Sequence, residues 1–288
     1  MLKYIGLRIF MPLAGRFPRV FYGLAYVAGW AVWKTNGSMR RRVQSNMLPA
    51  CDGDRRRANR EGLKALRNVA RYYVDLATLP RRDIANFERD HITIVNGGGL
   101  AVLAQPGPMI VMSAHMGDPE LAVQALTVRG RPFVALVEAL RPQPVADYLL
   151  GLRSAGGAKF YEADFRGLRA CVDTLKDGGL LGLVGDRDIK GTGVCVTMLG
   201  REVKLPGGPW ELARRTGATV LPVFCARRGM DDMTVFVEDA LRVNQEGDAE
   251  TAVREAVQAW ATILERQIRR EPGQWTVLED YWKVHGCG

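Results

Sequence analysis

The stretch that decides the fold is residues 109–128, MIVMSAHMGDPELAVQALTV. Met109–Met112 is a short apolar run, typical of a strand that is buried on both faces. Asp118 followed by Pro119 is a favoured pair for the N-cap and the first position of a helix, so we expect a helix over Glu120–Val128. A strand that leads directly into a helix is the repeating unit of a parallel α/β sheet.

The same alternation continues toward the C-terminus. We expect further strands at residues 133–137, 159–161, 180–184, 219–224 and 233–237, and helices at residues 144–152, 168–176, 209–215 and 249–270. Alternating strands and helices imply parallel crossovers with helices on both faces. The sequence therefore predicts an α/β fold with a mostly parallel central sheet flanked by helices, and we assign residues 91–288 to this domain.

Residues 1–90 read as a helical N-terminal region. Within Ala58–Thr78, apolar residues recur at helical spacing: Leu63, Leu66, Val69, Tyr73 and Leu76. The uncharged run Val20–Trp33 is about 14 residues long, short of the roughly 20 that a spanning helix needs. We expect this run to lie in a membrane interface, anchored by Trp30, Trp33 and the basic cluster Arg40–Arg42. A buried core helix is the alternative.

Composition narrows the function classes. The formal net charge is +9, and short arginine clusters favour an anionic surface as a partner. Zinc-finger spacing and an RNP-like aromatic run are both absent from the sequence, which argues against nucleic acid. The five cysteines lie far apart without a C-x-x-C pair, so we expect structural thiols in a reducing compartment.

His115 is the first candidate for chemistry. It follows the strand that ends near Met112, and the carboxyl ends of strands in an open α/β sheet form the ligand crevice. Gly117 permits a turn that brings Glu120, in the first helical turn, back toward His115. A carboxylate beside an imidazole fixes its tautomer and raises its basicity, as deprotonation of an alcohol requires. A structural histidine, with Asp118 only as a cap, is the alternative.

Two further groups are candidates for the same crevice. Asp186, Arg187 and Asp188 follow the apolar strand at residues 180–184, and one of these aspartates is a second candidate to orient His115 or the acceptor. An ion-paired turn is the alternative. Arg153 follows the helix at 144–152, where a guanidinium would hold a thioester oxygen or a phosphate, unless it is an ordinary surface arginine. We assign Gly117, Arg187 and Asp188 to substrate binding. The sequence contains neither a Walker A loop nor a G-x-S-x-G elbow.

Taken together, these residues resemble a known family. The motif His115-x-Gly117-x-x-Glu120-Leu121 is similar to the H-x4-D/E motif of the bacterial lipid A biosynthesis acyltransferases, which include phosphatidylinositol-mannoside acyltransferases. Other matching pieces occur in the family's order: Asn36–Ser38 with Arg40–Arg42 and Asn46, Leu152–Arg153 with Gly156–Gly157, Asp186–Asp188 with Gly191 and Gly193, Leu199–Glu202, Pro206–Pro209, Arg215–Ala218, and Pro272 with Gln274–Trp275. The resemblance covers most of the chain.

The resemblance implies transfer of a fatty acyl chain from acyl-carrier protein or acyl-CoA to a hydroxyl of a membrane glycolipid. The reaction would take place at the cytoplasmic face of the bacterial inner membrane, without a metal or other cofactor. His115 would be the general base, oriented by Glu120 or by Asp186, and Arg153 would assist the thioester or its oxyanion.

The acceptor is the least determined part of this interpretation. Glu120 as the acidic residue of the motif favours a lipid A-type acceptor over the mannoside branch. Pro119 stands where many family members carry Trp, and residues 276–281 lack the basic, aromatic run expected there. Another lipid acceptor is the alternative: a phosphatidylinositol mannoside, a lysophospholipid or an aminolipid. An alternative of another class is a non-catalytic lipid- or acyl-carrier-binding protein.

Overall fold

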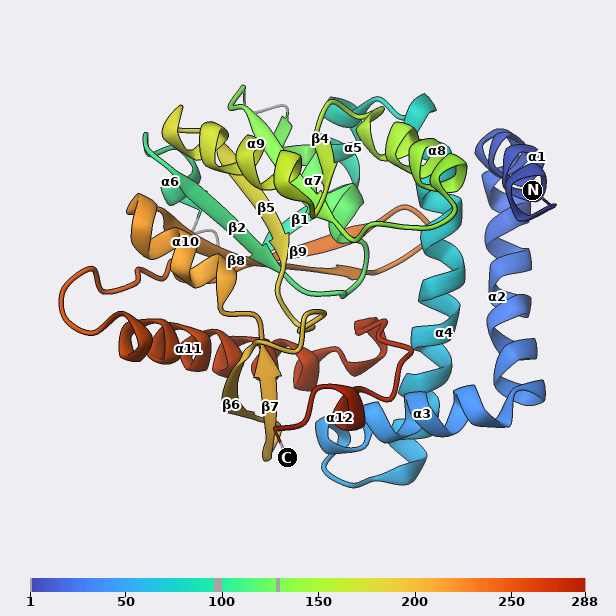
Figure 1. Cartoon of the computed structure of the whole chain (residues 1–288). Coiled ribbons are helices and arrows are strands. Elements are labelled where there is room, and N and C mark those ends of the chain that lie inside the picture. Colours follow the sequence, from blue (N-terminus) through green and yellow to red (C-terminus); the bar gives the residue numbers. More distant parts are fainter. Residues whose placement is uncertain (1, 96–99, 128–129, 288) are drawn as a thin grey trace.

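Helices make up the N-terminal third of the chain (Figure 1). The computed structural model describes residues 2–95, 100–127 and 130–287. The N-terminal elements are α1 (Leu2–Arg16), α2 (Pro18–Thr35), α3 (Gly37–Met47), η1 (Pro49–Cys51), α4 (Arg55–Thr78), η2 (Leu79–Arg81) and α5 (Ile84–His91). The predicted helical character of this region is confirmed.

A seven-stranded sheet in the order β1-β9-β8-β2-β5-β3-β4 forms the centre of the molecule. Its strands are β1 (Ile92–Val95), β2 (Met109–Ser113), β3 (Phe133–Val137), β4 (Lys159–Glu162), β5 (Leu180–Val184), β8 (Thr219–Arg227) and β9 (Met233–Val237). All neighbouring strands pair in parallel except β8 and β9, which are antiparallel. The mostly parallel sheet is therefore confirmed, and β2 lies at its centre, with its first four residues buried.

Helices cover both faces of the sheet, as the alternating pattern predicted (Figure 1). The elements are α6 (Leu100–Leu103), α7 (Pro119–Thr127), α8 (Gln143–Ser154), α9 (Phe165–Lys176), α10 (Gly208–Thr216), α11 (Ala249–Arg270), η4 (Pro272–Gln274) and α12 (Tyr281–Val284). Val128, the expected end of the helix after His115, lies outside the described residues. A separate antiparallel hairpin, β6 (Val194–Met198) and β7 (Arg201–Leu205), was not expected, nor was β1.

The N-terminal helices and the α/β part share one hydrophobic core. A single buried cluster includes Trp33, Val43 and Leu66 from the helices together with Trp260 and Trp275 from the C-terminal region. The expectation that Trp33 anchors the protein in a membrane is wrong, because this side chain is buried and lies against Gly62. Trp30 is 47% exposed, as an interfacial anchor requires.

Helix α4 also differs in detail from the expected helical pattern. Leu66 and Leu76 are buried, but Tyr73 is exposed, and it is the neighbouring Tyr72 that turns inward. In the described part of the chain, no helix combines the length and apolar character needed to span a bilayer.

The cysteines do not all remain thiols. Cys195 in β6 and Cys287 near the C-terminus form a disulfide, with Cα atoms 6.0 Å apart, so the expectation of five free thiols is wrong for this pair. The two residues are 92 positions apart in the sequence, a distance at which spacing carries no signal for pairing. Cys51, Cys171 and Cys225 are free and buried, as expected.

Candidate active site

His115 and Asp186 form a hydrogen-bonded pair at the carboxyl end of the sheet. His115 Nδ1 lies 2.7 Å from Asp186 Oδ1. The register of β2 and β5 explains this contact, because Ser113 pairs with Val184 and each functional residue comes two positions later. The Asp186 side chain is fully buried, whereas the His115 side chain is 37% exposed. The imidazole is therefore held by the protein and remains accessible to a substrate.

The C-terminal segment (residues 274–281) binds the second oxygen of the Asp186 carboxylate. Trp275 Nε1 donates to Asp186 Oδ2 at 2.8 Å, and the Tyr281 hydroxyl donates to the Asp186 backbone carbonyl at 2.7 Å. Trp275 and Tyr281 are both fully buried, and their rings pack edge to face. With both carboxylate oxygens bound, Asp186 is fixed in one orientation toward His115.

The backbone around His115 is joined to the same C-terminal segment. The Thr276 amide donates to the His115 carbonyl at 2.7 Å, and the Gly117 amide donates to the Gln274 carbonyl at 2.9 Å. Gly117 has a φ of 62°, and a Cβ there would lie 2.4 Å from the Cys225 carbonyl oxygen. Gly117 is thus required by a left-handed turn against β8. Its amide is already bound within the protein, and its predicted role in substrate binding stays a prediction.

Electrostatics make His115 a suitable general base. Burial on its own would lower the pKa of His115, but the charge and hydrogen bond of Asp186 outweigh it and raise the pKa above its usual value. Burial would likewise raise the pKa of Asp186, but His115 and the Trp275 hydrogen bond lower it. Asp186 is therefore ionised and accepts from Nδ1–H, which leaves the Nε2 lone pair to take a proton.

Among the described residues, the hydrogen-bond partners of Glu120 are not those expected, since His115 is not one of them. Its Oε2 accepts from the Tyr72 hydroxyl at 2.7 Å and from Arg153 Nε at 2.9 Å. Arg153 Nη2 also donates to the Tyr72 oxygen at 2.9 Å. Of the two acidic candidates, Asp186 is thus the one hydrogen-bonded to His115, while Glu120 holds Arg153. The charge of Glu120 still contributes to raising the pKa of His115.

Asp118 caps α7 as predicted, and it also belongs to a buried ion cluster. Its Oδ1 accepts from the Leu121 amide at 2.9 Å, and its Oδ2 accepts from Arg227 Nη2 at 3.0 Å. Arg227 also forms an ion pair with Asp75 of α4, which in turn accepts from the Tyr22 hydroxyl. This cluster fixes the start of α7, and hence Glu120, against α4.

Arg187 and Asp188 are bound within the protein. Arg187 donates to both carboxylate oxygens of Glu279, at 2.7 and 2.9 Å, and lies 3.7 Å from Glu138. Asp188 Oδ2 accepts from the Gly193 amide at 2.7 Å and closes its own loop. These contacts differ from the ion-paired Asp-Arg-Asp turn considered as the alternative, because Arg187 pairs with Glu279 and Glu138. The predicted role of both residues in substrate binding stays a prediction.

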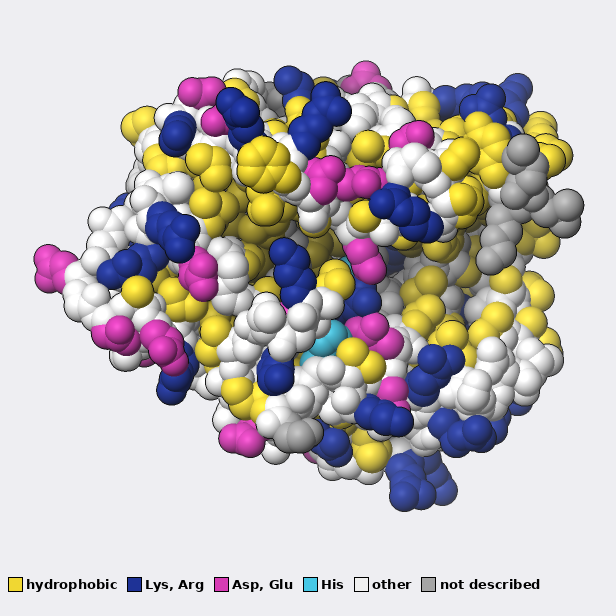
Figure 2. Space-filling model, in the orientation of Figure 1, with side chains coloured by type: hydrophobic (Ala, Val, Ile, Leu, Met, Phe, Trp, Pro, Cys, Tyr) yellow, Lys and Arg dark blue, Asp and Glu magenta, His cyan; other side chains and the backbone are white. Residues whose placement is uncertain are grey.

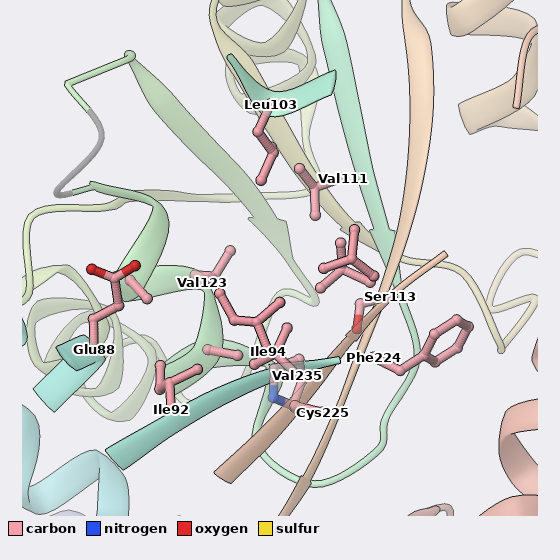
Figure 3. A pocket seen from close by; sticks show the side chains of 15 residues that line it. Glu88, Ile92, Ile94, Leu103, Val111, Ser113, Val123, Phe224, Cys225 and Val235 are labelled. Atoms are coloured by element: carbon pink, nitrogen blue, oxygen red, sulfur yellow. The ribbon is translucent and has the colours of Figure 1, made fainter. Parts of the chain in front are cut away.

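An apolar cavity lies between α7 and the sheet (Figure 3). Its walls come mainly from β1, β2, α7, β8 and β9, and almost all of its lining side chains are apolar. Ser113 and Pro119, which bracket the segment that carries His115, both line this cavity.

Several residues of the site were not singled out in the sequence. Trp275 carried a signal, since it lies in the C-terminal piece that resembles the family. Tyr72, Asp75 and Arg227 carried none, because they meet only through the packing of α4 against β8 and α7. Within the described residues, no group of three or more His, Cys, Asp or Glu side chains is placed to hold a metal ion.

The sequence is similar to known acyltransferases. The model of the family "Bacterial lipid A biosynthesis acyltransferase" matches residues 2–284. A phosphatidylinositol mannoside acyltransferase of Mycolicibacterium smegmatis is 27% identical over 229 residues, which cover 76% of this chain and 71% of that protein. A protein of the same name from Mycobacterium tuberculosis is 26% identical over 231 residues, covering 76% and 69%. The family match extends over nearly the whole chain, and this protein therefore belongs to the bacterial lipid A biosynthesis acyltransferase family.

Proposed function

We propose that this acyltransferase moves a fatty acyl chain from a thioester donor, acyl-CoA or acyl-carrier protein, to a hydroxyl of a membrane glycolipid. The observation that carries the proposal is the His115–Asp186 pair, whose free Nε2 is accessible at the end of β2. The apolar lining of the cavity beside Ser113 and Pro119 is compatible in character with a fatty acyl substrate.

The geometry supports a direct transfer. His115 Nε2 takes the proton of the acceptor hydroxyl as its oxygen attacks the thioester carbonyl carbon, so that a C–O bond forms. Arg153, held by Glu120, stabilises the oxyanion of the tetrahedral intermediate. Collapse of this intermediate breaks the C–S bond, and the proton on His115 passes to the departing thiolate. Asp186 stabilises the imidazolium throughout and stays ionised.

Two observations bear on the acceptor, and they favour different glycolipids. Glu120 as the acidic residue of the motif favours a lipid A-type acceptor. The names of the mycobacterial relatives point to phosphatidylinositol mannosides. Both acceptors present sugar hydroxyls at a membrane surface, so the same chemistry serves either, and the product decides between them.

We also propose that the protein is peripheral, bound to an anionic bilayer at the cytoplasmic face of the bacterial inner membrane. One face of α2 packs in the interior through Tyr22, Ala25, Gly29 and Trp33. The opposite face exposes Val20, Leu24 and Val27, between 55% and 60% each. Figure 2 shows hydrophobic side chains on the side where Figure 1 places α1 and α2, with Lys and Arg gathered below them. An apolar face flanked by cations supports binding to an anionic lipid surface.

The test is transfer of labelled acyl groups from acyl-CoA and from acyl-carrier protein to purified lipid A precursor and to phosphatidylinositol mannosides. We expect product from the wild type and a loss of roughly 10²–10⁴-fold in His115→Ala. His91→Ala is the matched control, because His91 is a surface histidine paired with Asp232. Mass spectrometry of the product identifies the acceptor and the position acylated. A folded wild type without product from any donor, or a His115→Ala variant of normal rate, would refute the proposal.

A further inference from the structure

We propose that Tyr72 is a positioning residue for acyl transfer, through which the N-terminal helical region takes part in the active site. This inference rests on the proposed function. Tyr72 belongs to α4, outside the α/β domain that carries His115, Asp186 and Arg153. It acts through Glu120 and Arg153.

The Tyr72 hydroxyl completes a closed set of three hydrogen bonds. It donates to Glu120 Oε2 at 2.7 Å and accepts from Arg153 Nη2 at 2.9 Å, while Arg153 Nε donates to the same Oε2 at 2.9 Å. An ion pair between two flexible side chains is only loosely oriented by charge. A hydroxyl that binds both partners at once fixes the rotation of the guanidinium relative to the carboxylate.

The set leaves specific atoms available to a substrate. Among the described residues, none hydrogen-bonds to Glu120 Oε1 or to Arg153 Nη1. The side chains of Glu120 and Arg153 are 19% and 13% exposed, so both remain in contact with solvent. Tyr72 therefore binds one oxygen of the Glu120 carboxylate and one terminal nitrogen of Arg153, and leaves Glu120 Oε1 and Arg153 Nη1 without a hydrogen bond to the described residues.

The chemistry of Tyr72 suits this role. Burial, and then the charge of Glu120, raise the pKa of Tyr72 well above its usual value. The hydroxyl therefore keeps its proton across the physiological range and remains a donor to Glu120.

The neighbouring ion cluster also fixes the position of Tyr72. Asp75 lies one helical turn further along α4, and its ion pair with Arg227 connects α4 to Asp118 at the start of α7. Glu120 is two residues beyond Asp118. Helix α4 thus binds the start of α7 at two neighbouring points. One is the ion cluster at Asp118, and the other is the hydrogen bond from Tyr72 to Glu120.

The test is Tyr72→Phe, with Tyr73→Phe as the matched control. Tyr73 is the adjacent residue, 42% exposed, and its ring contacts the Tyr72 ring, which both substitutions preserve. We expect Tyr72→Phe to lower kcat about 5- to 10-fold with little change in KM, because a hydrogen bond that orients Arg153 acts in the transition state. Tyr73→Phe is expected to match the wild type.

A double-mutant cycle separates positioning from a general structural effect. In a Glu120→Gln background, Tyr72→Phe should lower kcat by less than two-fold further, since its partner is already altered. Rates are measured well below the unfolding midpoint of the least stable variant, so that lost stability does not imitate lost positioning. A Tyr72→Phe variant within two-fold of the wild type, or a full additional loss in Glu120→Gln, overturns this inference alone. A wild type without transfer activity overturns the proposed function and this inference together.

Discussion

From the contact between His115 and Asp186 we predict how acyl transfer depends on pH. Removal of the charge in Asp186→Asn takes away the main cause that raises the pKa of His115, so this pKa should fall. A general base works in its neutral form, so transfer should be lost as pH falls through this pKa. In Asp186→Asn we expect that loss to move to lower pH, while the maximal rate falls roughly 10²–10⁴-fold. The measurement is kcat/KM against pH.

A control for this experiment is Asp173→Asn, which alters an exposed carboxylate on α9. Its pH profile should follow that of the wild type. An Asp186→Asn profile that keeps the wild-type midpoint would mean that Asp186 does not set the protonation of His115.

At the residue scale, the sequence predicts candidate site residues but not all of their contacts. His115, Glu120, Asp186 and Arg153 were all predicted, and all four lie at the carboxyl end of the sheet. Glu120 is five residues from His115, so the sequence favours it as the partner, whereas Asp186 is 71 residues away. Only the register of β2 with β5 makes Asp186 the neighbour. Strand order depends on which strands pack together, and periodicity carries no information about this choice.

Among the elements, the attachment of α4 to α7 depends on one buried cation. Arg227→Met would leave the carboxylates of Asp75 and Asp118 buried without a counterion, because the Arg227 side chain lies between them and is 4% exposed. We expect the free energy of unfolding to fall by about 3–5 kcal/mol. Urea unfolding measures this change, with the same m-value (the slope of unfolding free energy against urea concentration) in variant and wild type.

The matched control is Arg254→Met, which removes an exposed i,i+4 pair with Glu250 and should cost less than about 1 kcal/mol. A second variant, Arg227→Met with Asp118→Asn, should regain part of the loss because one stranded charge is removed. Equal effects of Arg227→Met and Arg254→Met would contradict the importance of the cluster.

The hairpin β6–β7 illustrates what a pattern search misses among elements. Buried residues do alternate with exposed ones in β6, and Gly200 supplies the turn, so a strand signal was present. The run is only five residues long, which makes its alternation a weak signal. The long helix α11 (Ala249–Arg270), with a sustained apolar face, was predicted with its observed bounds.

The disulfide joins β6 to the residues after α12, and we predict that the protein responds to reductant. Reduction of Cys195–Cys287 should lower the free energy of unfolding by typically 2–4 kcal/mol, since it releases a long covalent loop. Unfolding curves with and without dithiothreitol measure the difference. The double variant Cys195→Ser, Cys287→Ser should not respond to the reductant. Alkylation of five thiols in the oxidised protein would show that the bond does not form.

For the whole molecule, the exposed face of α2 predicts binding to vesicles. Leu24→Glu with Val27→Glu places two anions on this face and should reduce sedimentation with anionic vesicles strongly, without loss of the fold. The control is Met230→Glu with Val284→Glu, which changes exposed apolar residues on other elements. Binding by the wild type should weaken with added salt and with zwitterionic lipid. Undiminished sedimentation of the α2 variant would refute this orientation.

The attachment of the C-terminal segment to the site has a consequence for synthesis of the chain. On the ribosome, His115 and Asp186 are made before Trp275 and Tyr281, which fix Asp186. Thr276, which binds the His115 carbonyl, also belongs to this late segment. A nascent chain therefore contains the proposed catalytic groups before they are aligned, and alignment requires that residues 275–281 have been added. We therefore expect a stop codon after Gly273 to inactivate the enzyme, although all the proposed catalytic residues would still be present.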